Sequence, residues 1–300
     1  MKLEVSHQGS DSAAEKPSRR LSQEVHFVPR PSGGALYVVV TTPADAAPSR
    51  AVLLCPPVFE EHGRAYPVLR ELSRRLGARG VATLRFDYVG IGESSADPDV
   101  FTMSGARSDI SLLAGWLGER FAGACIVPLG VRFGARLVLD ALGERSHAAN
   151  ANIRTPILWD PVLDAREYIL GELRSTIAGA MVVYQAAPVS RDDIVRETLE
   201  SGGCERGGFK LNQIDGYLVT RELLEDAEVQ GTSAYTYSEP VFALISASSG
   251  DGERQKKQLT PKLPRMTFKA VKDDPYWNQP PTYSQVREHL FAATEELIER

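Results

Sequence analysis

The sequence has few cysteines, no excess of positive charge and no long apolar run, and each of these shortages excludes a class of protein. The three cysteines, Cys55, Cys125 and Cys204, are odd in number and widely spaced, which does not predict a disulfide framework. A formal net charge of −5 offers no basic face to a phosphate backbone, so we expect no nucleic acid as partner. No apolar run approaches the roughly 18 to 20 residues of a membrane-spanning helix, so we expect no membrane span.

The first residues also lack the apolar core of a signal peptide, which predicts a cytoplasmic protein. Because residues 1–20 are polar and of mixed charge, we expect them to form a disordered tail, with one domain over residues 21–300. No spaced set of His, Cys and acidic residues predicts a metal site, and no phosphate-binding glycine loop predicts a nucleotide. We expect no metal and no cofactor.

Short runs rich in β-branched residues alternate with longer amphipathic stretches, the pattern of strands joined by crossover helices. Strands are expected at 35–40, 51–55, 81–86, 124–129, 156–159, 241–245 and 266–271, and helices near 66–77, 104–121, 133–142 and 284–299. Parallel strands connected in this way need helices on both faces. The sequence therefore predicts an α/β fold with a mostly parallel, doubly covered sheet, and such sheets bind ligands at the carboxyl ends of their strands.

The alternation is interrupted between about residues 163 and 238, a segment that we interpret as a helical cap insertion. It contains helix-like pieces at 165–178, 191–200 and 220–227 and a glycine-rich loop at 202–208. A second polar stretch, residues 248–262, is expected to be an exposed excursion between the last two strands.

Three motifs follow expected strand ends in order. They are LCPPVFEEHG at residues 54–63, RFDYVGIGESS at 85–95 and LGVRFGA at 129–135. They resemble the α/β-hydrolase superfamily, in particular the serine-aminopeptidase-like branch that includes the exosortase-system-associated hydrolases. Residues 159–166, 215–218 and 274–277 also look like that group, so the resemblance covers about residues 25–300. It implies the α/β-hydrolase fold.

The resemblance also implies a serine nucleophile between the two glycines of the third motif, and here the sequence departs from the family. Gly130 and Gly134 keep the tight turn, but the residue between them at the nucleophile position is Arg132. A guanidinium is always protonated and cannot attack a carbonyl carbon. We therefore expect no conventional serine hydrolysis.

The other two members of a hydrolytic triad are also missing from their expected places. The loop after the last strand, residues 272–278, contains no histidine, and His289 follows too late, inside the terminal helix. Where the acid often lies the sequence reads Ser-Ala-Ser-Ser at 246–249, and nearby Asp251 has no histidine to orient.

Two interpretations of Arg132 stay open. At the carboxyl end of a central strand, beside a helix N-terminus, it would grip a carboxylate or phosphate with two hydrogen bonds. Alternatively, Arg132 pairs with Glu60, Glu61 or Asp160 and fills the pocket that the active site occupies in the related hydrolases. A buried guanidinium without any partner is costly, so one interpretation should hold.

Further catalytic candidates are His62, the histidine nearest the mouth of the site, Asp160 at a strand end, and Glu60. Glu60 and Glu61 are adjacent and point to different sides, so only one of them should face the site. Asp87, Ser94 and Ser95 are interpreted as turn residues, and Cys55 and Cys125 as buried, inert thiols. The predicted ligand-binding residues are Arg132, Phe59, Phe133, Tyr276 and Trp277; the last two either stack on a ligand or pack the last helix.

Three functions remain open at this stage. The leading hypothesis is a hydrolase homologue without a triad that binds a small molecule or peptide with an anionic group in the cleft under the cap, as an accessory protein of a biosynthetic or export pathway. The alternative is an unconventional hydrolase or isomerase that uses Arg132, oxyanion-hole amides and a carboxylate or a substrate group. The third is a structural partner that docks through its cap surface. A homodimer is also left open.

Overall fold

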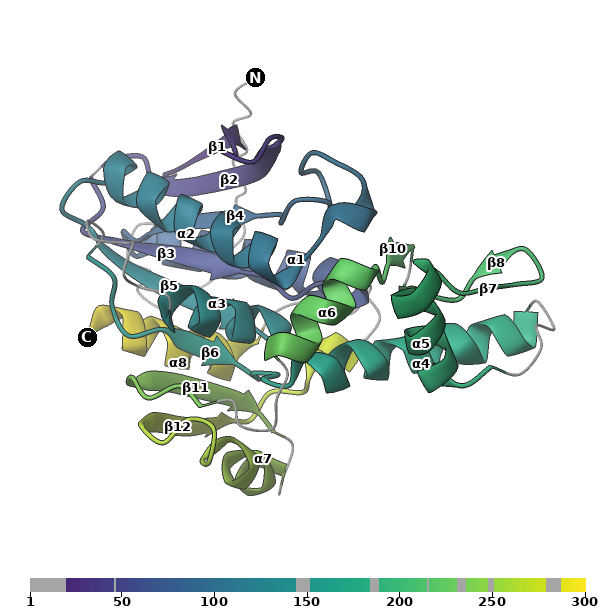
Figure 1. Ribbon diagram of the computed structural model, residues 1–300. Coiled ribbons are helices and arrows are strands. Elements are labelled where there is room, and N and C mark those ends of the chain that lie inside the picture. The colour runs from purple at the N-terminus through teal and green to yellow at the C-terminus, as the bar shows by residue number, and fades with distance from the viewer. Residues whose placement is uncertain are drawn as a thin grey trace.

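A mixed, mostly parallel sheet runs through the centre of the molecule (Figure 1). The computed structural model describes residues 20–45, 47–143, 152–183, 189–214, 216–230, 236–247, 251–278 and 287–300. Within these residues the sheet has eight strands in the order β1-β2-β4-β3-β5-β6-β11-β12. Their bounds are β1 Leu21–Pro29, β2 Ala35–Pro43, β3 Arg50–Cys55, β4 Ala82–Phe86, β5 Cys125–Val131, β6 Ile157–Trp159, β11 Val241–Ser246 and β12 Met266–Val271. The predicted tail, apart from Arg20, and the predicted start of the last helix at residue 284 lie outside the described residues.

The sheet becomes antiparallel only at its N-terminal edge, where β2 pairs antiparallel with both β1 and β4. All other neighbouring strands are parallel, as predicted. Sequence reasoning missed β1. The reason is that most of this edge strand is exposed, Val25 and Phe27 included, and that three of the four residues of its first part, 21–24, are polar.

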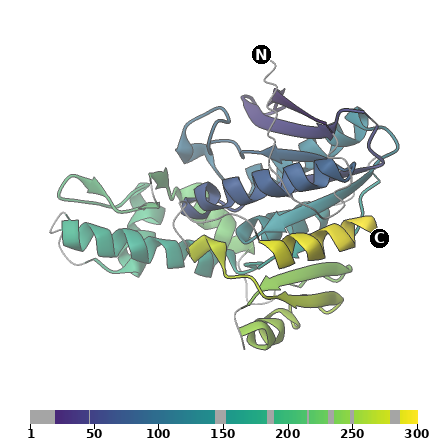
Figure 2. The same cartoon turned by 180° about the vertical axis from the view of Figure 1, so that it is seen from behind.

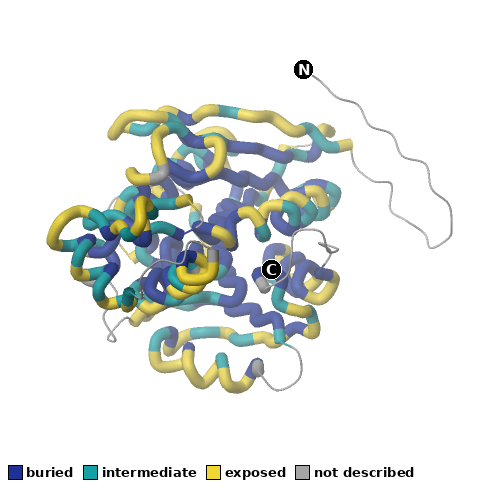
Figure 3. Tube along the Cα trace, turned by 90° about the vertical axis from the view of Figure 1, so that its right-hand side faces the viewer, coloured by how far each residue is buried: buried dark blue, intermediate teal, exposed yellow. Residues whose placement is uncertain are grey.

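Helices cover both faces of the sheet. α2 (Met103–Arg120) and α3 (Phe133–Gly143) lie on one face, and α1 (Glu60–Ala78) and α8 (Glu288–Glu299) lie on the other, seen from behind in Figure 2. Strand β3 shows the reason, because Leu53 and Cys55 belong to the apolar cluster beneath α2 and α3, whereas Val52 and Leu54 belong to the cluster beneath α1 and α8. Figure 3 shows the resulting concentration of buried residues in the strands.

The cysteines differ in burial. Cys55 is fully buried, and burial raises the pKa of its thiol well above the usual range. Cys125 was predicted to be buried, and this is wrong: it is the first residue of β5 and only partly buried, and its Sγ accepts hydrogen bonds from Asn152 and Arg154. Burial beside Glu197 raises the pKa of Cys204 to about 11.

Between β6 and β11 the chain leaves the sheet and forms a lobe to one side of it, here called the insertion (Figures 1 and 2). It contains α4 Ala165–Val183, α5 Arg191–Ser201, the short strand pairs β7 Glu205–Arg206 with β8 Phe209–Lys210 and β9 Gln213–Ile214 with β10 Tyr217–Leu218, and α6 Arg221–Gln230. Helix α5 begins with a capping box between Ser190 and Asp193 and ends at Gly202 in the left-handed conformation. The glycine-rich loop expected at 202–208 includes β7 and the turn of the β7–β8 hairpin.

The polar stretch between the last two strands was predicted to be an exposed excursion, and the structure adds a helix that was not predicted. This helix is α7 (Asp251–Leu259), most of whose described side chains are exposed, while Leu259 is buried. Two short 3-10 helices complete the description: η1 (Pro98–Val100) follows β4, and η2 (Tyr276–Asn278) follows β12.

Candidate functional site

The turn between β5 and α3 holds Arg132 at the carboxyl end of the sheet. Arg132 has a φ of 53°, a conformation that non-glycine residues seldom adopt. A Cβ on Gly130 would lie 2.5 Å from the Cα of Ala135, and a Cβ on Gly134 would lie 2.3 Å from the carbonyl oxygen of Pro56. Both glycines are therefore required for so tight a strand-to-helix turn, and the turn holds the Arg132 side chain at the sheet edge.

The Arg132 guanidinium is held by three groups of the protein. Its Nε and Nη2 donate to the same carboxylate oxygen, Oε1 of Glu61, at 3.0 and 2.9 Å. Its Nη1 donates to the backbone oxygen of Asp160 at 3.2 Å, and its Cζ lies 4.3 Å from the centre of the Trp277 ring. With 19% of the side chain exposed, the charge is mostly desolvated, so these contacts replace much of its hydration.

Glu61 is thus the carboxylate that pairs with Arg132. It lies in the first turn of α1, where a helix favours an acidic side chain, and its second oxygen accepts a hydrogen bond from the hydroxyl of Tyr168 at 3.2 Å. The adjacent Glu60 is exposed and bonds to Arg64 instead. As predicted, only one of the two glutamates faces the site, but the catalytic candidate chosen from the sequence, Glu60, is the one that does not.

Asp160 follows β6 and is buried beside the Arg132–Glu61 pair. Its carboxylate accepts a hydrogen bond from the Ser246 backbone N–H at 2.7 Å and another from the Ser246 hydroxyl at 3.0 Å. Burial raises the pKa of Asp160 to about 7, although the Ser246 hydrogen bonds and Arg132 favour the charged form; the charge of Glu61 raises it further. A carboxyl group that titrates near neutral pH is suited to general acid or base chemistry.

The aromatic candidates divide between two buried clusters. Phe59 and Phe133 pack on Tyr168 of α4, with ring centres 6.1 and 4.7 Å from its own, so they join the insertion to the sheet. Tyr276 and Trp277 pack with α1 and α8, their own rings 5.3 Å apart. Of the two alternatives for this pair, core packing describes Tyr276, whereas the face of Trp277 also contacts Arg132.

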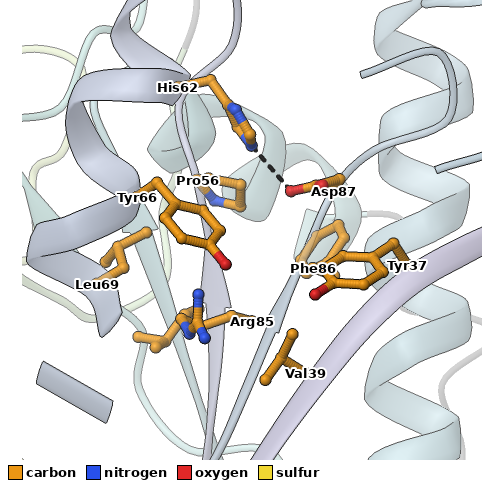
Figure 4. Close-up of a pocket in the computed structure, with 10 residues that line it drawn as sticks. Tyr37, Val39, Pro56, His62, Tyr66, Leu69, Arg85, Phe86 and Asp87 are labelled. Carbon is orange, nitrogen blue, oxygen red and sulfur yellow. Dashed lines mark hydrogen bonds and ion pairs between the residues drawn. The ribbon is translucent and has the colours of Figure 1, made fainter. Parts of the chain in front are cut away.

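His62 pairs with Asp87 and lies outside the described contacts of Arg132. Its Nε2 lies 3.0 Å from Oδ1 of Asp87, and both residues line a small cavity between α1, β2 and β4 (Figure 4). Asp87 also accepts the backbone N–H of Glu93, and the nearby Ser94 hydroxyl bonds to backbone groups of Tyr37 and Asp87. These contacts fit the interpretation of Asp87 and Ser94 as turn residues.

The residues near the positions where the family carries its catalytic histidine and acid are bonded to other groups. His289, in α8, is 62% exposed and lies 3.1 Å from Asp273. Ser246, at the end of β11, bonds to Asp160, and the side chain of Asp251 lies outside the described residues.

An open cavity of about 400 Å³ adjoins Arg132. Its described lining is made of Arg132, Asp160, Pro161, Arg254, Gln255, Gln258 and Leu259. The last four belong to α7 and were missed by sequence reasoning, because a polar stretch with no motif does not reveal that it folds back on the ends of β5 and β6. Phe59, Phe133, Tyr276 and Trp277 are not among these lining residues.

In the described part of the chain, no group of three or more His, Cys, Asp or Glu side chains is arranged to hold a metal ion. None of the described helices is both long and apolar enough to cross a membrane.

The sequence matches no protein-family model and no curated protein. Solved structures do resemble it. A putative hydrolase from Agrobacterium vitis S4 superposes with a TM-score of 0.57 at 17% identity, over 94% of this chain and 98% of that one. The α/β hydrolase domain-containing protein 10 from mouse superposes with a TM-score of 0.55 at 15% sequence identity, over 92% of this chain and 98% of that one. Est1E from Butyrivibrio proteoclasticus, solved with ferulic acid, superposes with a TM-score of 0.55 at 14% sequence identity, over 89% of this chain and 94% of that one. Together with the sheet topology, these similarities confirm that the chain has the α/β-hydrolase fold.

Proposed function

We propose that this chain is a hydrolase-fold protein without a Ser-His-Asp triad that binds a small molecule or peptide carrying an anionic group, as an accessory protein of a biosynthetic or export pathway. The observation that carries the proposal is the cavity of about 400 Å³ in which Arg132 and Arg254 converge. Its volume falls in the range of small-molecule sites, roughly 300 to 1,000 Å³. The ligand then lies between the strand ends and α7. From the sequence we expected it under the insertion, on another side of the strand ends.

The hydrogen bonds of Arg132 support a role beyond filling space. A guanidinium has five N–H donors, and among the described residues three of them are engaged, two by Glu61 and one by Asp160. Two N–H groups remain to donate to a ligand, as in bidentate carboxylate recognition. Pairing with Glu61 and binding an anion are therefore compatible.

The charge of the cavity supports the same class of ligand. Glu61 neutralises Arg132, and Asp160 is largely protonated below its pKa of about 7. Arg254 is exposed on α7 and adds a positive charge to the cavity wall, and the amides of Gln255 and Gln258 add neutral hydrogen-bonding groups. The cavity thus has a surplus of about one positive charge for a single anionic group.

The residues at the three triad positions argue against conventional hydrolysis. Arg132 replaces the nucleophile that the family resemblance implies, and a guanidinium cannot form an acyl intermediate. Residues 272–278, which follow the last strand, contain no histidine, and the nearest later one, His289, bonds to Asp273. The closer relation to the exosortase-associated group rests on the sequence motifs alone and is part of this proposal.

The binding proposal is tested by isothermal titration with a panel of small mono- and dicarboxylates, with Arg254→Gln as the variant and Arg196→Gln, on exposed α5, as the matched control. We expect saturable binding that Arg254→Gln weakens about tenfold, consistent with the loss of one charge-assisted hydrogen bond. The control should bind like the wild type. Equal affinity in the two variants, or recovery of a chemically changed ligand, would overturn the proposal.

Labelling with a fluorophosphonate probe tests the absence of a serine nucleophile separately. We expect no labelling and no turnover of p-nitrophenyl esters. Stoichiometric labelling would mean that a serine elsewhere has taken over the reaction.

The titration of Asp160 favours a second candidate function, an unconventional hydrolase or isomerase. Asp160 would transfer a proton or activate water, while Arg132 and the N–H groups in the first turn of α3 hold a developing negative charge. This function predicts that Asp160→Asn abolishes turnover of the true substrate while leaving its affinity within a few fold. Unchanged turnover in Asp160→Asn would remove Asp160 from the reaction.

A further inference from the structure

A second cavity lies away from the Arg132 site, between α1 and strands β2 and β4 (Figure 4). Tyr66 and Leu69 of α1 form one side of it, and Tyr37 and Arg85 come from the strands. The Arg85 guanidinium and the hydroxyl groups of Tyr66 and Tyr37 face the same space in the close-up. None of these residues belongs to the proposed ligand cavity of Arg132.

Arg85 is the unusual member of this cavity because two of its buried nitrogen atoms find no acceptor among the described residues. The residue is 6% exposed, and its Nε and Nη1 have no hydrogen-bond partner in the described chain. Its Cζ lies 4.9 Å from the centre of the Tyr66 ring, which is a cation–π contact. Ring contact alone does not replace the hydration that a buried guanidinium loses, so a ligand that accepts hydrogen bonds is strongly favoured here.

The alternation of β4 explains how an arginine comes to be buried. Leu84 and Phe86 belong to the apolar cluster beneath α2 and α3, so Arg85 must point to the opposite face, beneath α1. Asp87 lies on that same face but is engaged by His62 and by the backbone N–H of Glu93. The Asp87 carboxylate keeps its charge when it accepts these hydrogen bonds, but it points toward His62 and forms no ion pair with Arg85 among the described residues (Figure 4).

The size of the cavity decides the class of ligand. The centre of a water-sized sphere can move through only about 10 Å³ of it, so it holds one monatomic ion or one water molecule and is too small for a phosphate ester or a nucleotide. A water molecule would accept the Arg85 hydrogen bonds but would bring no opposite charge to the guanidinium. We propose that this cavity binds a single small monovalent anion of the size of chloride, held by Arg85 and the hydroxyls of Tyr66 and Tyr37.

Thermal unfolding in two salts of equal ionic strength tests this proposal on the full chain. Chloride is titrated against gluconate, which is too large for the cavity. Because a ligand that binds only the folded state stabilises it, we expect the wild-type midpoint to rise by roughly 2 to 4 °C for each tenfold increase of chloride above its dissociation constant. Arg85→Met should lose this dependence, whereas Arg85→Lys, which keeps the charge, should retain part of it.

Two controls separate this site from other sources of anion dependence. Arg196→Gln removes an exposed arginine of α5, and Arg74→Met removes an exposed arginine of α1; both should respond to chloride like the wild type. An equal response to chloride and gluconate in the wild type, or a chloride response that survives in Arg85→Met, would overturn the proposal.

Anomalous diffraction from crystals soaked in sodium bromide gives an independent readout. We expect a bromide peak within hydrogen-bonding distance of Arg85 Nε and Nη1, and no such peak in Arg85→Met crystals. A wild-type map with a water molecule there and no bromide would also overturn the proposal.

Discussion

Arg132, in the turn after β5, and Arg85, in strand β4, are two largely buried arginines, and the protein surrounds their charges with opposite kinds of partner. Arg132 receives a carboxylate, a backbone oxygen and the face of an indole. Arg85 receives the ring of Tyr66 and no hydrogen-bond acceptor among the described residues. The protein itself supplies a carboxylate to the first charge, whereas for the second we propose an anion that enters from solution.

The two arginines also lie in different kinds of backbone structure. Arg85 lies inside a strand, where alternation alone decides the face to which it points. Arg132 lies in a turn with positive φ, supported by close backbone contacts of Gly130 and Gly134. The turn fixes the backbone of Arg132, and its contacts with Glu61, Asp160 and Trp277 hold the guanidinium. A guanidinium held in this way is suited to recognise a ligand.

Removing the partner of Arg132 should have the largest effect. Glu61→Leu leaves a mostly buried guanidinium without its carboxylate and removes one of the two acceptors of the Tyr168 hydroxyl, which should lower the free energy of unfolding by about 3 to 5 kcal/mol. Urea denaturation at pH 7.5 measures the loss. Glu60→Leu is the matched control, because Glu60 is exposed and its bond to Arg64 should contribute less than about 1 kcal/mol. Similar losses in both variants would show that the Arg132–Glu61 pair adds little.

The titration of Asp160 should produce the next largest effect. Its pKa is raised from 3.8 to about 7 in the folded protein by burial, so between about pH 4 and 7 the folded state binds a proton that the unfolded state has already released. Stability from this group is therefore greatest at low pH and is lost as the pH rises through that window, by roughly 2 to 4 kcal/mol. Asp160→Asn does not titrate, so its stability should fall less over the same window. Parallel pH profiles of the two proteins would contradict the raised pKa.

Much of the fold could be predicted because the physical signals are local. Buried parallel strands such as β3 and β5 are continuous apolar runs, and turn glycines such as Gly130 and Gly134 are visible in the sequence. The edge strand β1 and the helix α7 could not be predicted in the same way. Both are largely exposed, so neither carries the apolar periodicity on which such predictions depend.

Arg132, at the centre of the candidate site, could be predicted from the sequence, whereas its neighbours Glu61 and Arg254 could not. The third motif identified Arg132, and the adjacency of Glu60 and Glu61 implied that one of them faces inward. The choice between Glu60 and Glu61 depends on how α1 is rotated about its own axis. That rotation is set by the packing of α1 on the sheet, and the local sequence does not reveal it. The approach of Arg254 to Arg132 has the same origin, since it follows from how α7 packs against β12 and not from a motif.

A change at Gly134 should disturb Arg132 while leaving the surroundings of Arg85 intact. The Cβ of Gly134→Ala would meet the carbonyl oxygens of Cys55 and Pro56 at 2.5 and 2.3 Å, so the backbone must shift at a cost of about 1 to 3 kcal/mol. Gly115→Ala in α2 is the control, because no heavy atom lies within 4 Å of its added Cβ and alanine favours the helix. We expect Gly134→Ala to weaken carboxylate binding but to keep the chloride response. Loss of the chloride response there would mean that the two arginines are coupled.

Replacing Arg85 itself should have the smallest effect on stability. In chloride-free gluconate buffer, Arg85→Met removes a charge that has no acceptor in the described chain, and it leaves no partner behind, so the free energy of unfolding should change by less than about 1 kcal/mol. Arg132→Met should cost more in the same buffer, because it leaves Glu61 buried without its cation. Urea denaturation of the two variants side by side measures the contrast. A loss in Arg85→Met as large as that in Arg132→Met would show that Asp87 already neutralises Arg85 across the cavity, and the two arginines would then be alike.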